Sequence, residues 1–140
     1  MARGGDSARV QCAALPWRRG RHGVEVLLIT SRETRRWVIP RGGRKGREPP
    51  SKAAAREAFE EAGVKGRIRR VPLGVYEYDK RLPTGRVQRV LVTVYPLSVK
   101  RELRLWPEKQ ERERLWIPPT AAAQLVDEPD LRRLLEQFEP

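Results

Sequence analysis

Three glutamates near the middle of the chain are the residues best suited to carry out chemistry. Glu60 and Glu61 follow Glu57 by three and four positions, the spacing that places side chains on one face of a helix. Like charges on one face repel each other, and a cation among them relieves that repulsion. Carboxylate oxygens without a neighbouring Cys or His favour magnesium, or manganese, over zinc. The spacing therefore predicts a divalent-cation site, although an exposed, salt-bridged helix face shows the same pattern.

A loop and a helix must position these glutamates. Residues 51–63 (SKAAAREAFEEAG) begin with Ser51, continue with strong helix formers and end with Gly63, which predicts one short helix that starts at Ser51 and closes at Gly63. Before it comes the loop at residues 40–43 (PRGG). The backbone of such a loop can approach a metal or a phosphate without obstruction by side chains. We therefore expect the loop and the acidic helix face to form one site.

At these residues the sequence resembles a known family. Gly42, five further residues, Glu48, seven further residues and then residues 56–64 (REAFEEAGV) match every fixed position of the Nudix box, the signature of Nudix hydrolases. The flanking segments, residues 31–32 (SR), 36–40 (RWVIP) and 61–66 (EAGVKG), are most similar to the diphosphoinositol polyphosphate phosphohydrolase branch. Arg41 stands where that branch commonly has glycine, and a basic residue after the proline is also similar to diadenosine polyphosphate and RNA pyrophosphohydrolases.

The resemblance implies a fold and a set of residue roles. The fold is α+β, an α/β/α sandwich in which a mixed central sheet carries the box helix on one face and a C-terminal helix on the other. Arg56 is expected to hold the glutamates in place, with Glu48 and Gly63 in structural roles. The implied catalytic residues are Glu57, Glu60 and Arg56, and the implied metal ligands are Glu57, Glu60, Glu61 and the backbone carbonyl of Arg41. The implied substrate-binding residues are Ser31, Arg32, Arg41, Gly42, Gly43 and Arg89, and one of Glu108, Glu111 and Glu113 is expected to join the metal site or act as a base.

The implied activity is hydrolysis of phosphoanhydride bonds, with magnesium or manganese as cofactor. A bound cation neutralises phosphate oxygens and activates a water molecule, which attacks phosphorus. The expected substrates are small polyphosphates or nucleoside-diphosphate-linked compounds, above all diphosphoinositol polyphosphates or diadenosine polyphosphates. Two alternatives stay open: an enzyme that acts on RNA 5′ ends or nucleoside triphosphates, and a basic nucleic-acid-binding module with a vestigial box.

Composition limits the class of protein. The 140 residues suit a single domain over residues 1–140, of which residues 1–7 are expected to be disordered. Lys and Arg number 30 against 18 Asp and Glu, a net charge of +12 that favours an anionic partner. No apolar run of membrane-spanning length and no export signal is seen, so we expect a cytoplasmic monomer or homodimer without a membrane partner. The single Cys12 is expected in the core, and the single His22 excludes a His-dependent triad or a multi-histidine zinc site.

Apolar segments and turns predict the sheet around the site. Residues 10–15 and 24–29 suggest a hairpin whose connection is the basic segment 16–22. Residues 68–78 and 86–99 predict a long antiparallel pair, with bulges or strand ends at Pro72 and Pro96. Candidates on this pair to line a substrate cleft are Tyr76, Tyr78, Arg86 and Arg89. A strand at 115–117, a helix at 120–126 and an amphipathic helix with Leu131, Leu134, Leu135 and Phe138 complete the chain.

Overall fold

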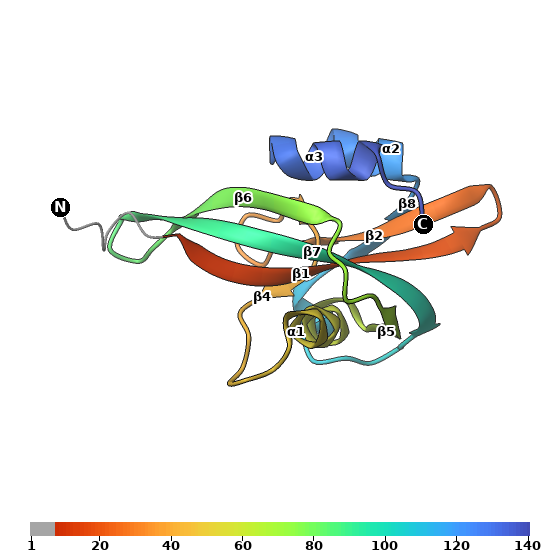
Figure 1. Cartoon of the computed structure of the whole chain (residues 1–140), viewed down its shortest axis with the longest axis horizontal. Helices are drawn as coiled ribbons and strands as arrows, with labels where there is room; N and C mark the ends of the chain where they lie inside the picture. The colour runs from red at the N-terminus through yellow and green to blue at the C-terminus, as the bar shows by residue number, and fades with distance from the viewer. Residues whose placement is uncertain (1–7) are drawn as a thin grey trace.

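A mixed β-sheet lies between helices on its two faces in the computed structural model, which describes residues 8–140 (Figure 1). The main path of the sheet is β3-β2-β1-β7-β5, with β4 paired to β1, β6 to β7 and β8 to β2. Helix α1 (Pro50–Glu57) covers one face, and α2 (Pro119–Leu125) and α3 (Pro129–Glu136) cover the other. The predicted α+β sandwich is therefore confirmed, whereas the predicted disorder of residues 1–7 lies outside the described residues.

Two long strands, β1 (Arg9–Gly20) and β7 (Val87–Glu102), form the centre of the sheet and run parallel to each other. On its other edge β1 pairs first with β4 (Arg41–Gly42) and then with β2 (Gly23–Thr30). The β1–β2 hairpin was predicted, but the predicted connection at 16–22 is wrong, because β1 continues to Gly20. Pro16 is tolerated within β1 because it falls between the residues that pair with β4 and those that pair with β2.

Strands β6 (Gly74–Arg81) and β5 (Val64–Ile68) share β7 as their partner. The first half of β7 pairs with β6 up to Val94, and the second half pairs with β5 from Leu97 onward. Pro72 lies in the connection between β5 and β6, so a strand ends there as predicted, whereas Pro96 lies inside β7, at the place where the antiparallel partner changes from β6 to β5. The short strands β3 (Trp37–Val38) and β8 (Arg114–Ile117) pair with β2, and β8 confirms the predicted last strand.

The helix that carries the glutamates is α-helical only in its first half. Pro49 is the N-cap of α1 and no side chain caps the helix, which begins at Pro50, one residue before the predicted start at Ser51. Proline suits the start of a helix because the N–H that it lacks has no partner there. From Ala58 to Ala62 the chain forms a π-helical turn, η2, which closes at Gly63 in the left-handed conformation with φ 67°, as predicted. A Cβ at Gly63 would lie 2.4 Å from the Trp106 ring, so a glycine is also needed for close packing.

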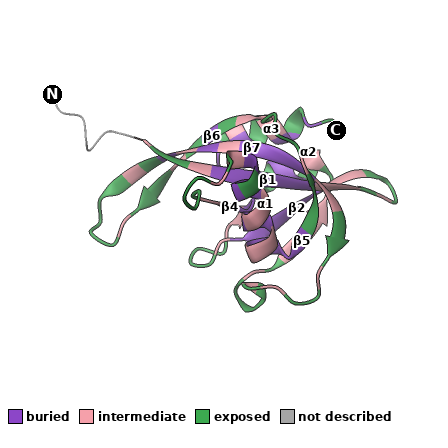
Figure 2. Ribbon diagram, turned by 60° about the horizontal axis from the view of Figure 1, so that its bottom comes forward, coloured by how far each residue is buried: buried purple, intermediate pink, exposed green. Residues whose placement is uncertain are grey.

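Apolar side chains form one core on each face of the sheet, and buried residues gather between the helices in Figure 2. On the α1 face Ala53 and Ala54 of the helix are fully buried and bring its backbone close to the sheet. Cys12 belongs to this core, as predicted. On the α3 face Leu131, Leu135 and Phe138 are buried, which confirms the amphipathic terminal helix. Among the helices of residues 8–140, none is long and apolar enough to cross a membrane.

Candidate active site

Gly42 brings the β4 backbone against the acidic helix. Its Cα pairs with that of Cys12 in β1, and a Cβ at Gly42 would lie only 2.2 Å from Oε2 of Glu57. A side chain at this position would therefore take the space that the Glu57 carboxylate occupies. The neighbouring Gly43 has no heavy atom within 4 Å of a Cβ built on it, so the close approach is confined to Gly42.

Glu57 and Glu61 are buried and lie next to each other, each with 8% of its surface exposed. The backbone N–H of Arg41 donates to Oε1 of Glu61 at 3.3 Å. Burial raises the pKa of the Glu61 carboxyl, and the adjacent Glu57 raises it further, while the Arg112 guanidinium opposes the rise. Two buried carboxylates held this close do not both ionise easily unless a cation lies between them.

Glu60 pairs with basic side chains and shares Nη1 of Arg56 with Glu57. Its Oε2 lies 3.7 Å from Nζ of Lys45 and 3.5 Å from Nη1 of Arg56. Within residues 8–140, no three His, Cys, Asp or Glu side chains converge into a metal-binding group. The structure thus brings together two of the three predicted carboxylates. These residues lie at a π turn, which hydrogen-bonds residues five apart instead of four, and in it Glu61 contacts Glu57 while Glu60 pairs with Arg56 and Lys45.

Arg56 is the centre of an ion-pair network that orients Glu57. Its guanidinium donates twice to Glu48, at 2.9 Å for each bond, and once to Oε2 of Glu57 at 2.9 Å. A further bond reaches the backbone oxygen of Gly43 at 2.9 Å. The Arg56 side chain holds the pKa of Glu48 down at about 2, with help from the backbone N–H of Lys45. The geometry agrees with the orienting roles expected for Arg56 and Glu48.

The three late glutamates differ in their partners. Glu108 accepts from Nη2 of Arg112 at 2.7 Å, and the same nitrogen lies 3.6 Å from Oε2 of Glu61. Glu111 and Glu113 instead pair with Arg32 and Arg35, each at 3.1 Å. Of the three, Glu108 is therefore the one beside the buried carboxylates. Arg112, which links them, was not singled out from the sequence, because nothing in the charged segment around it distinguishes this arginine from its neighbours.

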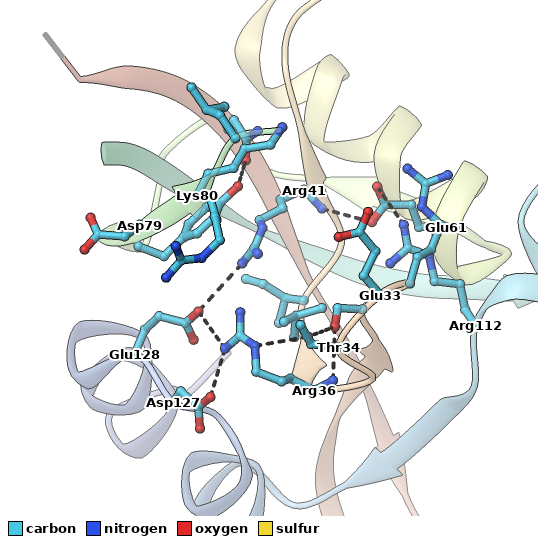
Figure 3. Close-up of a pocket in the computed structure, with 18 of the residues that line it drawn as sticks. Glu33, Thr34, Arg36, Arg41, Glu61, Asp79, Lys80, Arg112, Asp127 and Glu128 are labelled. Carbon is cyan, nitrogen blue, oxygen red and sulfur yellow. Dashed lines mark hydrogen bonds and ion pairs between the residues drawn. The ribbon is translucent and has the colours of Figure 1, made fainter. Parts of the chain in front are cut away.

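A cavity of about 1140 Å³ opens beside Glu61 (Figure 3). Its walls come from the loop between β2 and β3, from β4, from the turn between β6 and β7, and from the start of α3. Of the residues predicted to bind substrate, Ser31, Arg32 and Arg41 line this cavity. Gly42 and Gly43 do not line it and lie on the side of the acidic helix. Arg89 does not line the cavity, although Asp79, its register partner on β6, does.

The Arg41 side chain extends to the opposite face of the sheet from Gly42. Its Nη1 donates to the Tyr76 hydroxyl at 3.0 Å, and its guanidinium carbon lies 3.8 Å from the centre of the Tyr78 ring. Tyr78 lines the cavity, and Tyr76 is buried with 1% of its surface exposed. Of the predicted cleft residues on this strand pair, Tyr78 is thus placed at the cavity, and Arg86 is not.

Glu128, which sequence reasoning missed, is the most unusual residue of the cavity wall. It is 6% exposed, and neither carboxylate oxygen makes a hydrogen bond. Its closest cations are Nη1 of Arg36 at 3.6 Å and Nη1 of Arg41 at 3.9 Å. The only sequence signal is an acidic pair, Asp127 and Glu128, directly before the proline that starts α3, and such a pair usually serves the helix N-terminus.

The residues around Glu61 fit a divalent cation of the magnesium type. The donors are carboxylate oxygens only, and Gly42 leaves the space in which the Glu57 carboxylate sits. Magnesium is commonly held by one or two carboxylates, with waters and substrate phosphates as its remaining ligands. A cation would also offset the repulsion between the two buried carboxylates, Glu57 and Glu61. The pair therefore suits magnesium or manganese better than zinc.

Comparison with known families gives a match over nearly the whole chain. The family model described as the NUDIX domain matches residues 9–138. "Nudix hydrolase 12, mitochondrial" from Arabidopsis thaliana is 38% identical over 118 residues, which cover 82% of this chain and 58% of that protein. Human "Diphosphoinositol polyphosphate phosphohydrolase 3-alpha" is 38% identical over 113 residues, which cover 79% of this chain and 65% of the human protein. The chain thus spans about three fifths of the length of these relatives.

A solved structure supports the fold. The "MutT NUDIX hydrolase from Burkholderia pseudomallei" is 27% identical and superposes with a TM-score of 0.65, covering 95% of this chain and 99% of the other. The sheet, the helix with the glutamates and the C-terminal helices therefore form a known arrangement.

Proposed function

Because this chain belongs to the NUDIX family, we propose that it hydrolyses phosphoanhydride bonds of a small polyphosphate compound with the help of a divalent cation. The observation that carries the proposal is the buried carboxylate pair, Glu57 and Glu61, beside a cavity lined by arginines. Arginine suits phosphate oxygens through its planar set of donors. The name of the human relative refers to diphosphoinositol polyphosphates, which supports this class of bond.

Four residues, Glu57, Glu61, Arg56 and Glu60, have roles in the proposed reaction. Glu57 and Glu61 hold the cation, which when bound neutralises phosphate oxygens and activates a water molecule. Arg56 fixes Glu57 and is itself fixed by the two bonds that it donates to Glu48, so the Glu57 carboxylate keeps one orientation. Glu60, whose side chain is 27% exposed, is the carboxylate that remains to accept a proton.

The arginines of the cavity bind the phosphates of the substrate. Arg32 lies opposite Glu111, but both side chains are about half exposed, 58% and 45%, so this ion pair is weak. A phosphate group carries more charge than one carboxylate and displaces Glu111 from Arg32. Arg112, at 8% exposure, is held more firmly by Glu108 and keeps a positive charge beside Glu61.

The test is hydrolysis of a panel of compounds by the purified protein with magnesium or manganese. The panel holds diphosphoinositol polyphosphates, diadenosine polyphosphates, nucleoside triphosphates and RNA with a 5′-triphosphate. Glu57→Gln and Glu61→Gln should lose cation affinity and turnover together, whereas Glu60→Gln should lose turnover and keep cation affinity. Glu136→Gln, at an exposed position of α3, serves as the matched control. If both Glu57→Gln and Glu61→Gln turn over substrate at the wild-type rate, the assignment is wrong.

A basic nucleic-acid-binding module is the rival from another class, and the net charge of +12 favours it. Such a module has no use for two carboxylates buried side by side, which cost folding free energy without a cation. Failure of every compound in the panel to release phosphate, combined with tight and salt-sensitive binding of RNA, would favour the rival.

A further inference from the structure

Glu128 holds two unused hydrogen-bond acceptors in the wall of the cavity. Both of its carboxylate oxygens are buried and make no hydrogen bond, which is rare because such a group loses its contacts with water and gains none in return. The nearest nitrogens, on Arg36 and Arg41, lie 3.6 and 3.9 Å away, beyond hydrogen-bonding distance.

These two arginine nitrogens are already engaged elsewhere. Nη1 of Arg36 donates to Oδ2 of Asp127 at 2.9 Å, and Nη1 of Arg41 donates to the Tyr76 hydroxyl at 3.0 Å. Each arginine thus balances the charge of Glu128 from a distance without satisfying its oxygens. The acceptors of Glu128 remain for a donor that comes from outside the chain.

Arg41 lies between Glu128 and Glu61, the carboxylate beside which the reaction is proposed to take place. Its backbone N–H bonds to Glu61 at 3.3 Å, and the tip of its side chain lies 3.9 Å from Glu128. Glu61 and Glu128 therefore lie at the two ends of one arginine, and both line the same cavity (Figure 3). A substrate whose phosphates lie at Glu61 places its other end at Glu128.

A flat surface lies next to Glu128. The Arg41 guanidinium is layered on the Tyr78 ring at 3.8 Å, and the Tyr78 hydroxyl donates to Oε1 of Gln11 at 3.0 Å, which fixes the ring. Both guanidinium groups and tyrosine rings stack well on planar bases.

We propose that Glu128 recognises a nucleobase edge with two adjacent N–H donors, the pattern that guanine presents through its ring N–H and its exocyclic amino group. This inference rests on the proposed function of the same cavity. A carboxylate can accept two parallel N–H bonds, one on each oxygen. Adenine presents an acceptor nitrogen beside its amino group and matches only one oxygen. A densely phosphorylated inositol presents negative charge and acceptors, which an unsatisfied carboxylate repels.

The test compares three nucleotides that differ only in the base edge. GTP has both donors, ITP keeps the ring N–H but lacks the amino group, and ATP has one donor beside an acceptor. A site built around a hydrogen bond rejects an analogue that lacks it. The value of kcat/KM for GTP should therefore be about tenfold or more above the value for ITP, and at least as far above the value for ATP. Glu128→Gln should lower kcat/KM for GTP by about tenfold and change that for ATP by less than about threefold. Asp130→Asn, on α3 but outside the cavity, should leave all three values unchanged.

Binding of GDP, measured by calorimetry in the presence of magnesium, separates this inference from the proposed function. Weaker GDP binding in Glu128→Gln, with no compound hydrolysed, would support the inference and overturn the proposed function. Equal turnover of GTP, ITP and ATP by both wild-type and Glu128→Gln protein would overturn the inference and leave the proposed function intact. Hydrolysis of diphosphoinositol polyphosphates alone, without GDP binding, would also overturn it. Thermal unfolding of Glu128→Gln checks that the variant is folded.

Discussion

Replacing Gly42 by alanine isolates the placement of the Glu57 carboxylate from the stability of the fold. The new Cβ would lie 2.2 Å from Oε2 of Glu57, and ordinary contact starts at 3.4 Å, so the carboxylate must move by about 1.2 Å. The obstructing atoms are the end of a flexible side chain, which can rotate away at little cost to folding. Gly42 is also not among the glycines with positive φ, so alanine causes no backbone strain.

The expected loss of activity follows from this displacement. Misplacement of a catalytic group by 1 Å costs roughly 100-fold, which corresponds to about 2.7 kcal/mol of transition-state stabilisation. Gly42→Ala should therefore lower kcat/KM by roughly 100-fold and weaken manganese binding, while the midpoint of thermal unfolding shifts by no more than a few degrees.

Gly43→Ala is the comparison variant, since it makes the same change one residue later in the same loop. No heavy atom lies within 4 Å of a Cβ at Gly43, and its carbonyl can still accept from Arg56. We expect a loss of less than about tenfold. Phosphate release, manganese titration and thermal unfolding are measured on both variants. If Gly42→Ala loses no more activity than Gly43→Ala, Glu57 does not act at the position in which the structure holds it.

Three further predictions concern stability. Bonds from Arg56 lower the pKa of Glu48 to about 2 in the folded chain, so Glu48 stabilises the fold above its ordinary pKa of 4.5, and this contribution is lost as the pH falls from 4.5 towards 2. Glu48→Gln should therefore unfold at a lower temperature than wild type at pH 7, and the difference in unfolding temperature should close in acid. A difference that stays constant with pH would contradict the Glu48–Arg56 ion pair. Gly63→Ala places alanine at φ 67° against the Trp106 ring and should cost at least about 1–2 kcal/mol of unfolding free energy. Gly85→Ala, at φ 88° with open space around it, should cost less. Equal costs would show that the Trp106 ring moves aside without loss of stability. Leu135→Ala removes a fully buried side chain and should cost about 2–5 kcal/mol in denaturant titrations, so a cost below 1 kcal/mol would mean that α3 is not packed as described.

The sequence allowed the fold to be predicted where periodicity and turn residues agree. Short apolar segments identified the β1–β2 hairpin and β8, and the recurrence of leucines identified α3. Pro72 identified the break between β5 and β6, whereas at Pro96 β7 continues and only its antiparallel partner changes. The extension of β1 to Gly20 was missed, because a proline and several arginines there are typical of a loop. Only the change of partner from β4 to β2 makes Pro16 acceptable within the strand.

The candidate site was predictable in its residue types more than in its geometry. Spacing on an α-helix grouped all three glutamates, whereas in the π turn Glu61 contacts Glu57 while Glu60 pairs with Arg56 and Lys45. Residue propensities do not distinguish a π turn from an α-helix, because the same residues favour both. Arg112 and Glu128 were missed for another reason: each comes to the cavity from a segment more than 50 residues away from the glycine loop, and a single sequence does not show which distant charges meet.

The position of Cys12 provides the protein with a chemical reporter of its own. Its Cα pairs with Gly42, its thiol is 2% exposed, and burial raises the thiol pKa. The thiolate is the form of cysteine that attacks alkylating reagents, so this cysteine can be modified only when β4 separates from β1 or the chain unfolds. Since the chain has a single cysteine, the rate of labelling reports how often the chain opens at this one position, next to the loop that contacts Glu57. A ligand that clamps this loop should slow the labelling, whether or not it is cleaved.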